Sequence, residues 1–163
     1  MDAEILAKLK QIPIFDAIKD SDAFMRELHG VCSLKKYAQN EVIIKEGEIG
    51  SEMFVVFTGG VEIRKRTQAG DDYTVIKLNA GQNVFFGEMA LIDDDKRSAT
   101  VMAAEDSSFL VISKKDFIDL GNRQPQIGLP ITQAIARIIS SRMRKTTEDM
   151  LTIFDALVYE IRG

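Results

Sequence analysis

The spacing of hydrophobic residues changes twice along the chain. Across residues 3–29 the apolar positions recur at helical spacing, with an interruption at Pro13. From Val31 the period becomes two, which is typical of half-buried strands. After about residue 113 helical spacing returns. The pattern therefore predicts helices at both ends of the chain and a region of strands between them.

The middle region contains short alternating runs separated by turns rich in glycine. The clearest alternation of apolar and charged residues is at residues 61–66. The expected strands are residues 33–38, 41–45, 52–58, 60–66, 73–78, 84–86, 98–104 and 109–113. Eight short strands at this spacing favour an eight-stranded antiparallel jelly-roll barrel. We therefore predict an α+β, mainly β fold with helices in residues 1–30, the barrel in residues 31–113 and helices again in residues 114–163.

The C-terminal region is predicted to hold a short helix at residues 114–120 and a longer one that begins at Pro125 or Pro130 and ends near Ile161. Along its second half, seam residues follow one another at alternating steps of four and three: Met143, Thr147, Met150, Phe154, Leu157 and Ile161. Such a seam joins two helices side by side. The helix could instead pack on its own barrel, but its length favours a homodimer through residues 143–161.

Composition narrows the class of protein. The chain has 163 residues, the size of a single domain, and a net charge of −4, so no broad basic field is expected to attract nucleic acid or an anionic membrane. No apolar run approaches the roughly 20 residues of a membrane helix. The first residues do not resemble a signal peptide, and the single cysteine, Cys32, fits a reducing compartment. We therefore predict a cytoplasmic protein.

Few residues are available for metal or redox chemistry. The one histidine, His29, precedes the strands, which excludes the clustered histidines of metal-dependent jelly-roll enzymes. Cys32 alone cannot hold an iron–sulfur cluster. The acidic run at residues 93–95 is interpreted as a solvated turn. Catalytic motifs are also missing, so the sequence predicts a protein that is not an enzyme and has no metal or cofactor.

Binding chemistry is concentrated in residues 85–101. Gly87 lets the backbone approach a ligand closely, and the N–H groups of a helical turn at residues 88–91 would form an anion site. Arg97 follows after a short loop, where its planar fork could clamp the same anion. Glu88 would repel a phosphate and is better suited to accept a hydrogen bond from a sugar hydroxyl. These residue types together predict a site for a sugar phosphate.

The order Phe-Gly-Glu-x-Ala-Leu at residues 86–91, followed by Arg-Ser-Ala-Thr-Val at residues 97–101, resembles the phosphate-binding cassette of cyclic-nucleotide-binding domains. That family includes bacterial catabolite activators and regulatory subunits of protein kinase A. The resemblance implies that three residues lie against the cyclic phosphate and ribose: Gly87, Met89 and Ala90. It also implies that Glu88 holds the ribose 2′-hydroxyl, Arg97 the cyclic phosphate, and Ser98 the phosphate or the base.

The run at residues 142–148 resembles the corresponding helix of catabolite activators, in which an arginine precedes a Thr-Ser pair that binds the adenine amino group. The resemblance implies that Thr146 contacts the ligand of its own subunit and Thr147 that of a partner subunit. It also makes Arg142 a candidate ligand contact. The alternative is that these polar side chains are simply solvated on an exposed helix.

The function that follows from the resemblance is that of a signalling sensor. The chain is expected to bind a 3′,5′-cyclic nucleotide, with cyclic AMP favoured over cyclic GMP, and to couple the ligand to its long C-terminal helix. No DNA-binding domain is expected in these residues, so the output would pass to an unknown downstream protein. The alternative is a dimerising interaction module whose pocket holds no ligand.

Overall fold

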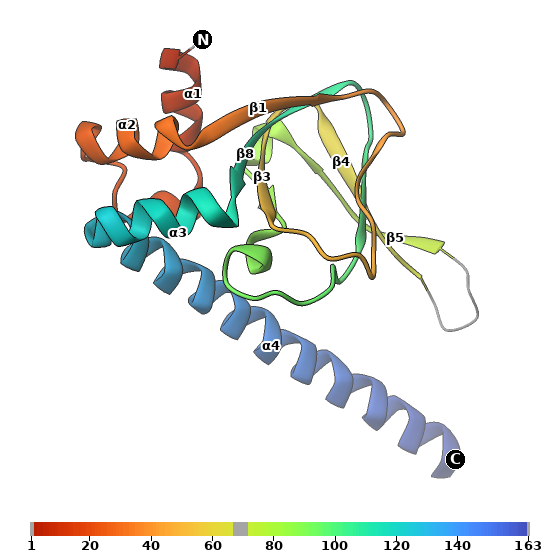
Figure 1. The fold of residues 1–163 in the computed structure, drawn as a ribbon. Coiled ribbons are helices and arrows are strands. Elements are labelled where there is room, and N and C mark those ends of the chain that lie inside the picture. Colours follow the sequence, from red (N-terminus) through yellow and green to blue (C-terminus); the bar gives the residue numbers. More distant parts are fainter. Residues whose placement is uncertain (1, 67–71, 163) are drawn as a thin grey trace.

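Helices flank the strands, as the hydrophobic spacing predicted. The computed structural model describes residues 2–66 and 72–162 (Figure 1). The helical elements are α1 (Asp2–Leu9), η1 (Pro13–Phe15), α2 (Asp22–Gly30), η2 (Ala80–Gln82), η3 (Glu88–Leu91), α3 (Lys114–Arg123) and α4 (Pro125–Arg162). Ser21 begins α2 as its N-cap, because its hydroxyl accepts a hydrogen bond from the Phe24 amide at 3.3 Å. None of the described helices is both long and apolar enough to cross a membrane.

All eight predicted strands form, and they are arranged in two antiparallel four-stranded sheets. The first sheet has the order β1 (Cys32–Tyr37), β8 (Ser107–Ser113), β3 (Glu52–Thr58) and β6 (Phe85–Phe86). The second has the order β2 (Val42–Ile44), β7 (Thr100–Ala103), β4 (Gly60–Arg66) and β5 (Asp72–Asn79). The predicted strand at residues 98–104 is shorter than expected, so Ser98 lies in the loop before β7.

The prediction of a closed barrel is not supported. Within the described residues, no strand of one sheet is laddered to a strand of the other. The sheets meet through side chains instead, in a core that contains Ile44, Phe54, Val56, Val61, Phe86, Val101, Phe109 and Val111. A barrel and a pair of facing sheets both bury one face of each strand, so alternation along the sequence does not distinguish them.

β3 and β8 are buried on both faces. Phe54 stacks on Phe86 with ring centroids 5.1 Å apart, and both rings meet Phe109 edge-on inside the sheets. On the opposite face, Met53 and Leu110 pack against the helices. These two strands therefore contribute to two hydrophobic cores, one against the helices and one between the sheets.

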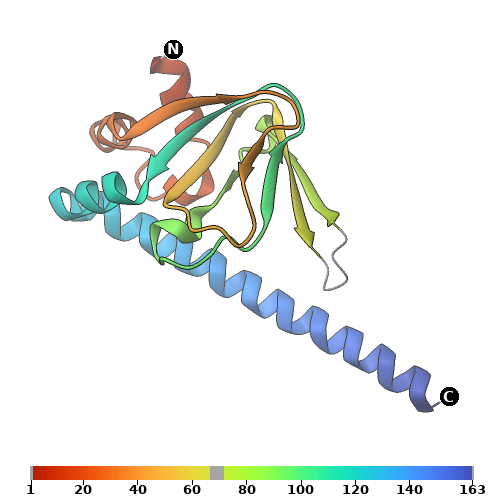
Figure 2. The ribbon, with the colours of Figure 1, turned by 45° about the vertical axis from the view of Figure 1, so that its right-hand side comes forward.

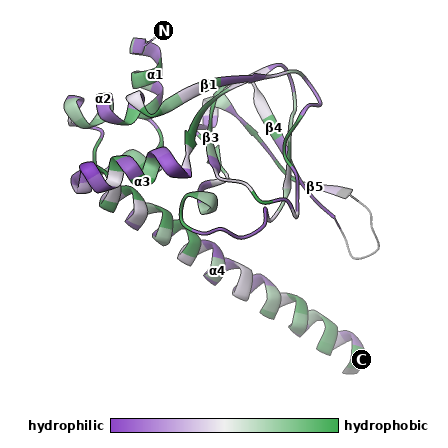
Figure 3. Ribbon diagram, viewed as in Figure 1, coloured by the Kyte–Doolittle hydropathy of each residue, from purple (hydrophilic) through white to green (hydrophobic). Residues whose placement is uncertain are grey.

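α4 has a buried half and an exposed half. Near its start, Ile127, Ile131 and Ile135 are almost fully buried in the core shared with the other helices. Figures 1 and 2 show the second half extending past the sheets, and Figure 3 shows that it carries apolar residues. Phe154 is 62% exposed and Ile161 is 83% exposed. The protein's own sheets therefore do not cover the predicted seam.

Candidate functional site

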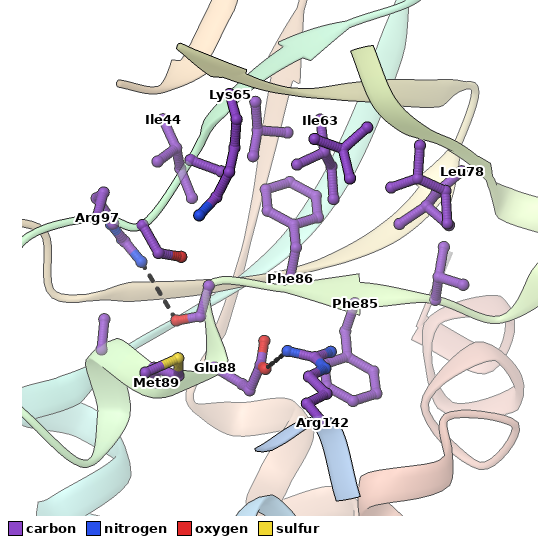
Figure 4. Close-up of a pocket in the computed structure, with 18 of the residues that line it drawn as sticks. Ile44, Ile63, Lys65, Leu78, Phe85, Phe86, Glu88, Met89, Arg97 and Arg142 are labelled. Carbon is purple, nitrogen blue, oxygen red and sulfur yellow. Dashed lines mark hydrogen bonds and ion pairs between the residues drawn. The ribbon is translucent and has the colours of Figure 1, made fainter. Parts of the chain in front are cut away.

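A cavity of about 830 Å³ lies between the second sheet, the β6–η3 segment, the loop before β7 and α4 (Figure 4). This volume is within the range typical of small-molecule sites, which is roughly 300–1,000 Å³. Eight of the nine predicted ligand residues line it: Gly87, Glu88, Met89, Ala90, Arg97, Ser98, Arg142 and Thr146. Thr147 is not among the lining residues. Two segments far apart in the sequence, residues 87–98 and 142–146, therefore meet at one cavity.

Gly87 begins η3 in a backbone conformation that suits glycine. Its φ is +75°, in the left-handed region, and the Ala90 amide donates to its carbonyl at 3.2 Å. A Cβ at this position would lie 2.9 Å from Nη1 of Arg97 and 3.0 Å from the Glu52 carbonyl oxygen. Only a glycine lets these groups come so close together.

Arg97 is fixed against the backbone of the cassette. Its Nη1 donates to the Gly87 carbonyl at 3.2 Å and its Nη2 donates to the Glu52 carbonyl at 2.7 Å. Gly50 leaves room for the guanidinium, since a Cβ there would lie 2.3 Å from Nε. Burial lowers the pKa of Arg97, and the carboxylates of Glu52, Glu88 and Asp93 oppose this shift. A guanidinium stays protonated in proteins, so the site holds a fixed positive charge.

Glu88 is buried and paired. Only 2% of the residue is exposed, and its carboxylate is in an ion pair with the guanidinium of Arg142 on α4 (Figure 4). Sequence reasoning placed both residues at the ligand but did not predict their contact. A buried carboxylate requires such a partner, because removing a charge from water is costly. The pair is a direct connection between the cassette and α4.

The two threonines of α4 form the same bond to their own helix. Oγ1 of Thr146 donates to the Arg142 carbonyl, and Oγ1 of Thr147 donates to the Met143 carbonyl, each at 3.0 Å. A hydroxyl that donates its only hydrogen retains lone pairs that accept. Toward the cavity, Thr146 is therefore a hydrogen-bond acceptor.

Sequence reasoning missed the wall that β4 and β5 contribute. It consists of Ile63, Lys65, Val75, Ile76 and Leu78. The strand register shifts between Ile63, which pairs with Ile76, and Arg64, which pairs with Thr74. Val75 is thereby left without a partner, and it lines the cavity together with its neighbour Ile76. The alternation at residues 61–66 is a signal for the β4 residues, but no sequence signal predicts the irregularity in β5.

The cavity lining is basic although the chain is acidic overall. Among the described residues, its charged residues are the five cations Lys65, Lys96, Arg97, Arg142 and Lys145 and the four acids Glu88, Asp93, Asp95 and Asp149. The lining thus has a formal charge of +1, whereas the whole chain has −4. A local excess of positive charge suits an anionic ligand. No group of three or more potential metal ligands occurs in residues 2–66 and 72–162.

Residues 34–124, more than half of the chain, match the family model of the cyclic nucleotide-binding domain. The chain belongs to this family. It is similar to the cyclic AMP receptor protein of Thermus thermophilus, with 31% identity over 101 residues that cover 62% of this chain and 46% of that protein. It is also similar to human cGMP-dependent protein kinase 2, with 42% identity over 83 residues that cover 50% of this chain and 11% of that protein. The chain thus spans less than half the length of these curated relatives.

Solved structures share the fold of the cyclic nucleotide-binding domain. The catabolite activator protein of Thermus thermophilus has a TM-score of 0.74 at 25% identity, covering 85% of this chain and 61% of that chain. The N-terminal domain of a transcriptional regulator from Streptomyces coelicolor has a TM-score of 0.73 at 26% identity, covering 88% of this chain and 94% of that one. The predicted family and the arrangement of β-sheets with helices are therefore confirmed.

Proposed function

We propose that the chain binds a 3′,5′-cyclic nucleotide in this cavity and acts as a signalling sensor, without catalysing a reaction. The observation that carries the proposal is the fixed guanidinium of Arg97 beside the left-handed Gly87. A cyclic phosphate, which has one negative charge, fits beside Arg97, with Gly87, Met89 and Ala90 against it and the ribose. Ser98 would donate to the phosphate or to the base.

The sugar is assigned to Glu88. Its carboxylate is held by Arg142 and has further lone pairs with which to accept a hydrogen bond from the ribose 2′-hydroxyl. A phosphate is excluded from this position by charge repulsion. The buried acid and the half-buried cation thus give the ligand one orientation, with ribose at Glu88 and phosphate at Arg97.

We infer that the base is adenine rather than guanine. The Thr146 hydroxyl donates to its own helix and offers the cavity an acceptor, which matches the adenine amino group. Guanine presents a carbonyl oxygen at the corresponding position. That oxygen is itself an acceptor and forms no hydrogen bond with the Thr146 hydroxyl oxygen. Relatives are named for both cyclic AMP and cyclic GMP, so cyclic GMP is retained as the second candidate ligand.

We infer that the ligand is coupled to α4 and that α4 joins two copies of the chain. The Glu88–Arg142 ion pair links the sugar position to this helix, so a ligand at Glu88 changes the free energy of the contact. Residues 143–161 expose the apolar seam, which a second copy would cover, with Thr147 at the interface. The shift in α4 would then act on a downstream protein.

Thermal unfolding with and without ligand tests the proposal. A ligand present at a hundred times its Kd stabilises the folded chain by about 2.7 kcal/mol. We expect cyclic AMP to raise the unfolding temperature more than cyclic GMP, and adenosine to have little effect because it lacks the phosphate. No shift with either cyclic nucleotide would favour the alternative, a dimerising module that binds no ligand.

A further inference from the structure

Lys65 occupies an inward position on β4. Val61, Ile63 and Lys65 follow one another at a spacing of two; Val61 is fully buried and the other two line the cavity. The residues between them face outward, where Glu62 binds Arg64 and Lys77 at 2.7 and 2.6 Å. At Lys65, therefore, a positive charge stands where the strand pattern otherwise places an apolar residue.

The ammonium of Lys65 has no ion pair or hydrogen bond with any residue of the described chain, whereas Arg97 and Arg142 are both engaged. Lys96 and Lys145 also line the cavity without partners for their ammonium groups in residues 2–66 and 72–162. They belong to a loop and to α4, however, whereas Lys65 belongs to β4 and pairs with Tyr73 of β5. Of these three lysines, Lys65 is the one that reaches the cavity from the second sheet.

The side chain of Lys65 is directed toward the end of the cavity that Arg97 occupies. In Figure 4 it extends from β4 with its nitrogen turned into the cavity, across from the Gly87–Glu88 segment and on the Arg97 side of Phe86. The carboxylate of Glu88 is already paired with Arg142. The geometry therefore leaves Lys65 available for an anionic group placed at Arg97.

We propose that Lys65 is a second cation for the ligand's phosphate, which it contacts from the sheet side while Arg97 contacts it from the cassette side. This inference rests on the proposed function and deepens it. A cyclic phosphodiester has two exocyclic oxygens that share one charge, and one can accept from the Arg97 fork and the other from the Lys65 ammonium. The residue would thereby select anionic ligands over uncharged nucleosides.

Calorimetric titration of cyclic AMP and cyclic GMP into Lys65→Met, Lys65→Arg and the parent tests this role. Lys77→Met is the matched control, because Lys77 is on the same hairpin but binds Glu62 on the outer face. At low ionic strength we expect Lys65→Met to bind the preferred nucleotide about fivefold to tenfold more weakly, and Lys65→Arg and Lys77→Met to bind like the parent. The ratio of the Lys65→Met dissociation constant to that of the parent should approach 1 near 1 M salt, where the Debye length falls to about 3 Å.

Each contrary result has a distinct meaning. Parent-like binding by Lys65→Met at low salt, or a loss that does not depend on salt and is not restored by arginine, overturns the role of Lys65 as a phosphate cation. Such a result leaves the proposed function intact, since the parent still binds. If the parent itself binds neither cyclic nucleotide, the proposed function fails and the inference fails with it.

Discussion

Arg97 is the residue on which the phosphate assignment depends. We expect Arg97→Ala to weaken cyclic AMP binding well over tenfold, because a buried charge left without its partner costs about 2–5 kcal/mol. Arg64→Ala is the matched control, since Arg64 binds Glu62 on the outer face of β4. Calorimetric titration measures the affinity of both variants for cyclic AMP. If Arg97→Ala folds and binds like the parent, the assignment of the cassette is wrong.

Glu88 has a separate, sugar-specific test. Glu88→Gln retains the shape of the side chain but loses its charge, so we expect a smaller loss of affinity than for Arg97→Ala. The parent should prefer cyclic AMP over its 2′-deoxy analogue, and this preference should narrow in the variant because a neutral acceptor binds the hydroxyl less strongly. The ratio of the two dissociation constants is the measurement, with Glu62→Gln as control. An unchanged ratio would count against Glu88 as the ribose contact.

Gly87 links backbone conformation to stability. We expect Gly87→Ala to lower the free energy of unfolding by about 1–3 kcal/mol, because alanine is strained at a positive φ and its Cβ would crowd Arg97. Gly30→Ala is the control, since no atom lies within 4 Å of a Cβ at that site. Urea unfolding compares the two variants. Equal midpoints for parent and Gly87→Ala would show that the conformation of this residue is not restrictive.

Short sequence motifs decided which site residues could be predicted. Gly87, Glu88 and Arg97 belong to one short motif, and the motif's order was enough to place them at a common cavity. The pairing of Glu88 with Arg142 joins positions 54 residues apart and required the fold. Lys65 was missed for another reason: in an alternating strand, a lysine at an inward position looks the same as one in solvent until the opposite wall is known.

At the scale of elements, the sequence predicted where strands and helices lie better than how they assemble. The change of period from helical to two and back again located all eight strands and the terminal helices. It did not distinguish a closed barrel from two facing sheets, since both bury alternate residues. The start of α4 at Pro125 rather than Pro130 was similarly left open, because proline is compatible with either first turn.

The exposed half of α4 makes a prediction about assembly. We expect Phe154→Glu to convert a dimer to a monomer, because it places a charge in an apolar seam where burying one large side chain contributes about 1.5–3 kcal/mol. Tyr159→Glu is the control, since Tyr159 is 82% exposed and lies off the seam. Light scattering after size exclusion gives the mass. A parent that stays monomeric at high concentration, or a dimeric Phe154→Glu, would contradict the proposed interface.

The molecule as a whole has a net charge of −4, and its cavity contains the predicted phosphate cation Arg97 and the Glu88–Arg142 ion pair that joins the predicted cassette to the long helix. Calorimetric titration of refolded, nucleotide-free protein with cyclic AMP and then cyclic GMP tests the central claim most directly. We predict one site per chain, with cyclic AMP bound at about 1 μM or tighter, some 8 kcal/mol, and cyclic GMP bound more weakly. No heat and no thermal stabilisation with either nucleotide would contradict the claim that this cavity is a cyclic nucleotide site.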